Sequence, residues 1–514
     1  METDKEFLKE RYIPAVISES SGEYTLPDYN TDVKRLLSIN ARAVPSSSFM
    51  DGETLECVGV VAYDIIYLDS ENNLTHCEFT TDYELRVKCN SESYQDARVG
   101  TRVKNYSVRP LGPRRFSAKC VLDSAIYITE RERIAIEGDA FTDGEPEVST
   151  AMAQAATAYY SERQEREYAE TLISLEGVIA DDVDVLALSS SIRLNNIAPV
   201  EGGVEYQGEL EATALLVIGD ELPTHRSVII PISGMLPIED MEEGMDAAVD
   251  VCVTSLRSSI NPTEVGVDIT VSAITEATAT ARGNESVRLI TDCYLKECGI
   301  ENQYTNVDFC AHLGTKRENI GLEMEFDRKD VGAESLRNII HSFAVCSLDE
   351  SAVDADGVTL KGNLRLSVMA CEINDDGMPA YVGLKIDVPF SEKVKHSCQN
   401  ATNAICEMQV ISCDLSLDGE KLYICATIGC STVLLGNSTH RIVTSSVKAE
   451  ECTAPLGSDI VIYYPEEGES LFEVARLFRT SLLKLASDNS LSESAFRSPS
   501  SSSSLSGVRK LIIK

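Results

Sequence analysis

The stretch that decides the fold begins with Asp356-Gly357-Val358-Thr359-Leu360-Lys361-Gly362 and continues with Asn363-Leu364-Arg365-Leu366-Ser367-Val368. Apolar or small residues occupy every second position after the turn, and polar residues alternate with them. A period of two puts alternate side chains on opposite faces, which predicts a half-buried β-strand. The Asp-Gly pair is typical of tight turns, so we expect this strand to follow a hairpin turn.

The same pattern occurs twice more along the chain. Aligning Gly52, Gly203 and Gly357 gives intervals of 151 and 154 residues. The apolar faces of these two copies are Leu55, Cys57, Gly59, Val61 and Tyr63, and then Tyr206, Gly208, Leu210, Ala212 and Ala214. Further alternating runs follow in the same order, first at 97–103, 247–253 and 404–410, and then at 116–122, 265–271 and 422–428. Because solenoid repeats span only about 20–50 residues, this long period indicates whole repeated domains.

We therefore predict a mainly β protein with three tandem β-sandwich-like repeats and a small C-terminal βααβ module. The expected boundaries are an N-terminal segment 1–30, repeat 1 at 31–145, a connector at 146–180, repeat 2 at 181–295, a connector at 296–332, repeat 3 at 333–448 and the terminal module at 459–514. Residues 149–160 are rich in alanine, a good helix former. The sequence leaves helix and strand open across the connectors.

The acidic composition of the chain limits the kinds of molecule that it is expected to bind. The chain has 83 acidic and 45 basic residues, a net charge of −38, so we expect no binding to nucleic acid, whose recognition needs clustered Lys and Arg. Such a surface suits basic protein partners, although the acidity is equally compatible with the general composition of the host. We expect no signal peptide and no membrane insertion, because no apolar run approaches the roughly 18 residues of a spanning helix.

No pattern of catalytic or metal-binding residues emerges. The 16 cysteines are scattered, often within apolar runs such as Ile424-Cys425-Ala426, and are expected to be small buried side chains in a reducing cytoplasm. The six histidines do not lie at metal-ligand spacing, and nucleophile-elbow, phosphate-loop and dinucleotide-binding motifs are missing from the sequence. We predict no catalytic residues, no metal and no cofactor.

The C-terminal residues follow a different pattern. A short strand at 459–464 is followed by a turn and by an amphipathic helix whose apolar face is formed by Leu471, Phe472, Val474, Ala475 and Phe478. Glu469-Ser470 and Thr480-Ser481 are candidate helix caps, and 510–513 is a second strand.

The run 468–481, Gly-Glu-Ser-Leu-Phe-Glu-Val-Ala-Arg-Leu-Phe-Arg-Thr-Ser, resembles the LysM signature. It differs at Phe472, where Trp is common, at Asp488, where an apolar residue is usual, and by a Ser-rich insertion at 498–504. The resemblance implies a groove between two loops that holds N-acetylglucosamine polymers or, as the departures favour here, a protein. The residues of this groove would be Gly468, Glu469, Ser470, Asp488, Asn489 and Leu491.

Three long β-rich repeats followed by one LysM-like module resemble the SPOCS-domain proteins of spore-forming Firmicutes, in particular the clostridial SipL-type group. The resemblance implies a non-enzymatic assembly protein of the spore coat, located in the mother-cell cytoplasm at the forespore surface. Its expected partners are a coat-morphogenetic ATPase, bound through the LysM-like module, or other coat proteins. The alternatives are a LysM-mediated binder of peptidoglycan in cortex or cell wall, which the expected lack of an export signal disfavours, and a hydrolase with unrecognised sites.

Overall fold

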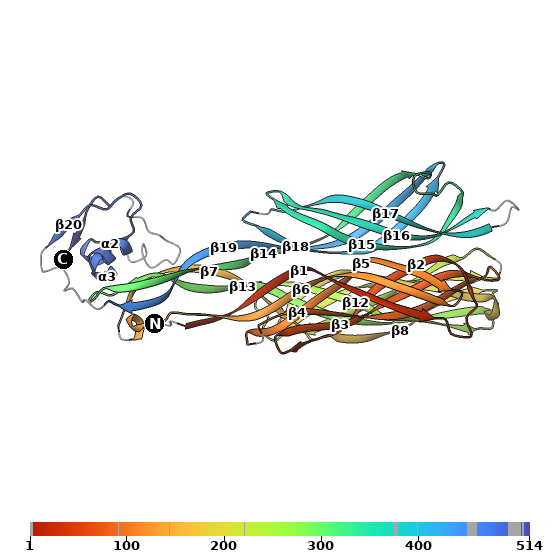
Figure 1. Cartoon of the computed structure of the whole chain (residues 1–514), viewed down its shortest axis with the longest axis horizontal. Helices are drawn as coiled ribbons and strands as arrows, with labels where there is room; N and C mark the ends of the chain where they lie inside the picture. The colour runs from red at the N-terminus through yellow and green to blue at the C-terminus, as the bar shows by residue number, and fades with distance from the viewer. Residues whose placement is uncertain are drawn as a thin grey trace.

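The computed structural model of the chain describes residues 4–90, 92–142, 144–219, 221–373, 379–397, 399–449, 460–491, 505 and 508–514. β-Strands dominate these residues, so the predicted mainly β class is confirmed. The molecule is elongated, and most strands run along its long axis (Figure 1). Both chain termini lie at the same end, beside a small helical segment.

Six of the sheets form three pairs, which we call sheet pairs 1, 2 and 3 in chain order. Sheet pair 1 contains β1 (Asp4–Thr25), β6 (Arg115–Ala135) and β5 (Tyr94–Gly112) in one sheet, and β2 (Val33–Asp51), β3 (Thr54–Asp69) and β4 (Leu74–Lys88) in the other. Sheet pair 2 contains β12 (Asp246–Pro262), β13 (Gly266–Tyr294), β7 (Glu147–Tyr160) and β8 (Gln164–Glu176), and then β9 (Val183–Val200), β10 (Gly203–Ile218) and β11 (Thr224–Pro237). Sheet pair 3 contains β14 (Ile300–Asp327), β19 (Lys421–Lys448) and β18 (Asn403–Asp418), and then β15 (Leu336–Asp354), β16 (Gly357–Ile373) and β17 (Pro379–Lys395).

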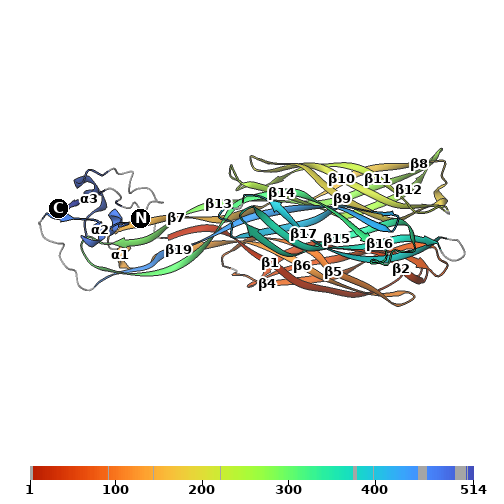
Figure 2. The same cartoon turned by 90° about the horizontal axis from the view of Figure 1, so that it is seen from above.

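The three sheet pairs share one connectivity. In each, the first strand pairs antiparallel with the last, the last pairs with the strand before it, and the three strands between form a meander in the second sheet. In sheet pair 2 the first strand is divided into β7 and β8, which both pair with β13. The view from above shows the three sheet pairs side by side with their long axes in the same direction (Figure 2).

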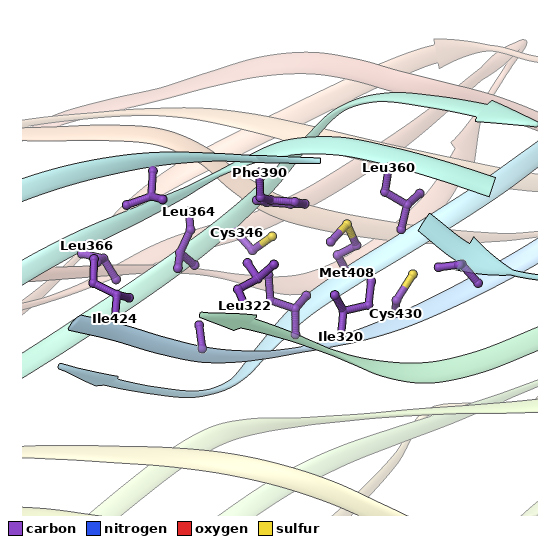
Figure 3. Close-up of a cluster of buried hydrophobic side chains, with 14 of the residues drawn as sticks. Ile320, Leu322, Cys346, Leu360, Leu364, Leu366, Phe390, Met408, Ile424 and Cys430 are labelled. Atoms are coloured by element: carbon purple, nitrogen blue, oxygen red, sulfur yellow. The ribbon is translucent and has the colours of Figure 1, made fainter. Parts of the chain in front are cut away.

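The core of each sheet pair follows the period-two pattern. In sheet pair 3, Leu360, Leu364 and Leu366 of β16 are fully buried and pack against side chains of the facing sheet, including Leu322 (Figure 3). Burying one such leucine contributes about 1.5–3 kcal/mol relative to leaving it exposed. The polar face differs from the expectation at Ser367, which is buried because sheet pair 1 covers it.

The middle strand of each meander contains a glycine where the neighbouring strand approaches closely. The positions of these three glycines show which residues of the three sheet pairs are equivalent. A Cβ atom at Gly208 would lie 2.4 Å from the carbonyl oxygen of Arg193, and the equivalent position is Gly59 in sheet pair 1 and Gly362 in sheet pair 3. At all three the neighbouring strand has a register shift, so its backbone approaches closely. Gly203 and Gly357 are thus equivalent to Thr54, not to Gly52, and the alignment of the first copy was displaced by two residues.

The segments expected to link repeats are used differently in the structure. Residues 149–160, for which helix and strand were both open, lie in β7, and the connectors at 146–180 and 296–332 contribute β7, β8 and β14. The N-terminal segment 1–30 likewise contributes β1. These strands pair with the last strand of their sheet pair, and that long-range pairing outweighs the helix preference of alanine.

Residues from all three sheet pairs form shared apolar clusters. One contains Leu37, Leu186 and Ile340, a second contains Phe7, Val287 and Phe309, and a third contains Tyr127, Tyr160 and Val433. A buried ion pair also joins sheet pairs 1 and 2, because Glu10 and Arg282 are each only 4% exposed and lie 3.1 Å apart. The three sheet pairs are therefore not independent domains on a string of linkers, because they pack against one another through buried side chains.

Most of the 14 cysteines within the described residues are buried, as the sequence predicts, but a few are partly or fully exposed. Cys425, which the sequence placed in an apolar run, is exposed. Its neighbours Ile424 and Ala426 occupy the core face of β19, so the alternation of the strand turns Cys425 outward.

The remaining elements are short. The helices are α1 (Asp139–Thr142), α2 (Leu471–Leu477) and α3 (Leu482–Asp488), with a 3₁₀ turn η1 (Ala180–Asp182) and a two-stranded sheet of β20 (Val461–Tyr463) and β21 (Leu511–Ile513). None of the helices in the described ranges has the length and apolar character needed to cross a bilayer.

Candidate functional site

The C-terminal module, residues 460–491 with 505 and 508–514, follows the order β20, α2, α3 and β21. Leu471, Val474 and Ala475 of α2 pack with Leu485 and Leu511 in one cluster, with Phe472 and Phe478 partly buried against it. The predicted apolar helix face thus forms the core. Asp459 and the Ser-rich insertion at 498–504, both noted in the sequence, lie outside the described residues.

The start of α2 is capped as the sequence predicts. The Ser470 hydroxyl accepts a hydrogen bond from the Glu473 N–H at 3.2 Å, and the Glu473 carboxylate accepts from the Ser470 N–H at 2.7 Å. This reciprocal pair is a capping box, which satisfies two amide groups that the first helical turn leaves open. Ser481 is the N-cap of α3 but makes no side-chain capping bond.

The first predicted binding loop is tied together internally. Gly468 has a positive φ of 91° with open space around its α-carbon, as a tight turn requires. The Glu469 carboxylate accepts from the Tyr463 hydroxyl at 3.0 Å and from the Glu466 N–H at 3.0 Å. The hydrogen bond to Glu469 is the first cause of a raised pKa at Tyr463.

The second predicted loop is also used for structure. The Asn489 amide donates to the carbonyls of Leu485 and Ile512, at 2.9 and 2.7 Å, and accepts from the Ile512 N–H at 2.6 Å. It therefore joins α3 to β21. Leu491 donates its N–H to the Ala486 carbonyl at 2.9 Å and packs on the module core. Asp488, the last residue of α3, lies 3.7 Å from the Lys514 ammonium.

The two predicted loops offer few free backbone donors. The N–H groups of Glu469, Ser470, Asn489 and Leu491 all bond within the module, and the Leu505 N–H donates to the Glu469 carbonyl at 3.0 Å. No hydrogen bond between described residues joins one loop to the other. Acetamido groups of a glycan would have to displace these internal bonds.

A docking contact holds the module against the end of β13. The Tyr294 hydroxyl donates to the Thr480 carbonyl at 2.7 Å, and its ring meets that of Phe472 edge-on at 5.2 Å. Arg476 of α2 forms an ion pair with Asp292. Burial raises the pKa of Tyr294, which belongs to the module cluster. Sequence reasoning missed this contact, because nothing local marks a tyrosine that pairs with a residue 186 positions away.

The outward side of β20 is apolar. Ile462 of β20 is 55% exposed, and Ile460 and Tyr464, which flank the strand on either side, are 67% and 70% exposed. Within the described residues, β20 pairs only with β21, which leaves its other edge open. Open edges and exposed apolar faces are typical of surfaces that bind another protein chain. This surface, which we call the β20 face, was not predicted from the sequence, because 460–464 is a continuous apolar run that does not show which of its side chains stay exposed.

In the described part of the chain, no three or more His, Cys, Asp or Glu side chains gather as metal ligands would. Comparison with family models found no match, and no curated protein matches the sequence.

Proposed function

We propose that the protein is a non-enzymatic scaffold of spore-coat assembly, which docks through its C-terminal module on a coat-morphogenetic ATPase. The resemblance to the SPOCS-domain proteins and to LysM motivates the identity of the partner. The tandem-repeat interpretation is supported by the common connectivity of the three sheet pairs. In this proposal the sheet pairs are a rigid spacer, located at the forespore surface in the mother cell, and the module is the docking end.

The observation that carries the proposal is the β20 face. Three large apolar side chains, one on β20 and one directly on either side of it, are each more than half exposed and favour contact with another protein. The net charge of −38 favours a partner with a basic surface around its apolar contact. A glycan instead needs polar donors, and the N–H groups of Glu469, Ser470, Asn489 and Leu491 in the two predicted loops are already bonded internally.

The decisive experiment measures binding of the full-length protein to the purified ATPase and to muropeptides. Ile462→Ser is expected to weaken ATPase binding by about tenfold or more, as loss of a central apolar contact does. The matched control is Ile229→Ser on β11, where the isoleucine is similarly exposed, at 60%, but lies in sheet pair 2.

Equal loss of ATPase binding in both variants would contradict docking through the β20 face. Binding of muropeptides without binding of the ATPase would establish the peptidoglycan alternative instead. A fluorescent fusion provides the test in cells, because the proposed scaffold should form a shell around the forespore during sporulation, and an even cytoplasmic distribution would argue against it.

A further inference from the structure

A cavity of about 340 Å³ lies where the three sheet pairs meet. β5 of sheet pair 1, β9, β12 and β13 of sheet pair 2, and β14 and β18 of sheet pair 3 all contribute to its lining. Five arginines line it, namely Arg98, Arg102, Arg193, Arg282 and Arg317. The lining holds only three carboxylates, so the cavity has an excess of two positive charges in a chain whose net charge is −38.

The three carboxylates of the lining are already engaged. Asp250 pairs with Arg98, and Glu318 lies 2.7 Å from the Lys316 ammonium. Glu407 accepts a hydrogen bond from the Tyr127 hydroxyl at 2.7 Å and lies 3.4 Å from Arg102. Burial alone would raise the pKa of Glu407, but the arginines around it and the tyrosine hydroxyl lower it to about 2. All three carboxylates are therefore already paired with other basic groups, and they do not neutralise the remaining arginines.

Arg282 has donor capacity that the protein leaves unused. Its Nε donates to both oxygens of Glu10, at 3.1 and 3.2 Å, and its guanidinium lies over the Tyr127 ring, 4.8 Å from the centroid. Its Nη2 atom is buried and has no hydrogen-bond partner among the described residues. Because a buried donor without a partner is unfavourable, an acceptor at this position would be favoured.

Two further arginines stand at the exposed rim. The side chain of Arg193 makes no hydrogen bond or ion pair within the described ranges, and Arg317 donates from Nη2 to the Ala247 carbonyl at 2.7 Å. Partial desolvation, followed by the charge of Arg282, lowers the pKa of Arg317. Its guanidinium is therefore held in an environment already crowded with positive charge, which an anion would relieve.

We propose that this cavity binds a phosphate dianion, either free or as a small phosphomonoester. A dianion balances the excess of two positive charges, and its oxygens match the forked donors of arginine. The side chains of Asn319, Gln409 and Ser431 in the lining supply neutral donors. A volume of 340 Å³ is at the lower end of small-molecule pockets, which leaves room for a compact organic group beside the phosphate. Because the lining comes from all three sheet pairs, the bound anion would hold them together.

The test uses the full-length protein and inorganic phosphate in isothermal titration calorimetry at low salt and pH 7.5. We expect saturable binding with a dissociation constant below about 1 mM. The double variant Arg193→Gln, Arg317→Gln should weaken it by about tenfold or more, since each arginine contributes charge-assisted hydrogen bonds. Arg257→Gln is the matched control, because Arg257 is an exposed arginine of β12 outside the lining. This control should bind as the unmodified protein does.

The same titration is repeated with acetate, a monoanion, at equal ionic strength and with phenyl phosphate, a phosphomonoester. Weak binding of acetate supports a site for dianions, and tighter binding of phenyl phosphate than of inorganic phosphate supports the phosphomonoester form. Heats for phosphate no larger than those for acetate, or an equal loss in Arg257→Gln, would overturn the proposal. The outcome is independent of the proposed docking on the ATPase, because the cavity lies among the sheet pairs and not in the C-terminal module.

Discussion

The buried ion pair between Glu10 and Arg282 joins sheet pairs 1 and 2, and neutralising one partner should weaken their association. Both side chains are 4% exposed, the Arg282 Nε lies 3.1 Å from the nearer carboxylate oxygen, and the Tyr160 hydroxyl donates to the same carboxylate at 3.1 Å. Glu10→Gln keeps the shape of the side chain but leaves the guanidinium without its counter-charge. Breaking a buried pair in this way costs about 3–5 kcal/mol.

Urea unfolding followed by circular dichroism measures this change in the free energy of unfolding. The matched control is Glu132→Gln, because Glu132 pairs with Lys9 at a similar distance of 2.9 Å but is 36% exposed. Such exposed pairs contribute about 0–1 kcal/mol, so the control should be nearly neutral. The double variant Glu10→Met, Arg282→Met removes both charges and should be more stable than Glu10→Gln alone. A loss in Glu10→Gln no larger than in the control would refute the reasoning.

Three further outcomes are expected. Leu471→Ala should destabilise the C-terminal module by about 2–5 kcal/mol, because it removes a buried side chain. Faster hydrogen exchange in α2 and loss of partner binding would report this change. An unfolded module with undiminished partner binding would contradict docking through the module. Burial, and then the neighbouring His225, lowers the pKa of His341 from 6.5 to about 3, so the stability that neutral His341 contributes is full above pH 6.5 and is lost as the pH falls toward 3. His341→Gln should therefore reduce the slope of the free energy of unfolding against pH between 6.5 and 3. An unchanged slope would contradict the lowered pKa. Gly208→Ala should lower the free energy of unfolding by about 1–3 kcal/mol, because the new Cβ atom would clash with the Arg193 carbonyl. Gly321→Ala is the control and should lower it by less, because its Cβ atom would meet no atom within 4 Å. Equal losses in thermal or urea unfolding would contradict the steric role of Gly208.

Local patterns in the sequence determined much of the strand content and the start of α2. The alternation through Leu364 and Leu366 depends only on which face of one strand meets water, so it can be recognised without knowing the partner strand. The capping box of Ser470 and Glu473 is equally local, because its two members are three residues apart. Of the predicted binding residues, Glu469 and Asn489 have side chains that form hydrogen bonds within the module.

Only the tertiary structure decided how the pieces are joined. The pairing of β1, β7 and β14 with the last strand of each sheet pair, the contact of Tyr294 with Thr480, and the burial of Ser367 all join residues far apart in the chain. The arginine-lined cavity has the same origin, since Arg98, Arg282 and Arg317 come from three different sheet pairs. Such contacts leave no periodic signal, because their energy depends on packing geometry and desolvation at a distance, not on the neighbours along the backbone.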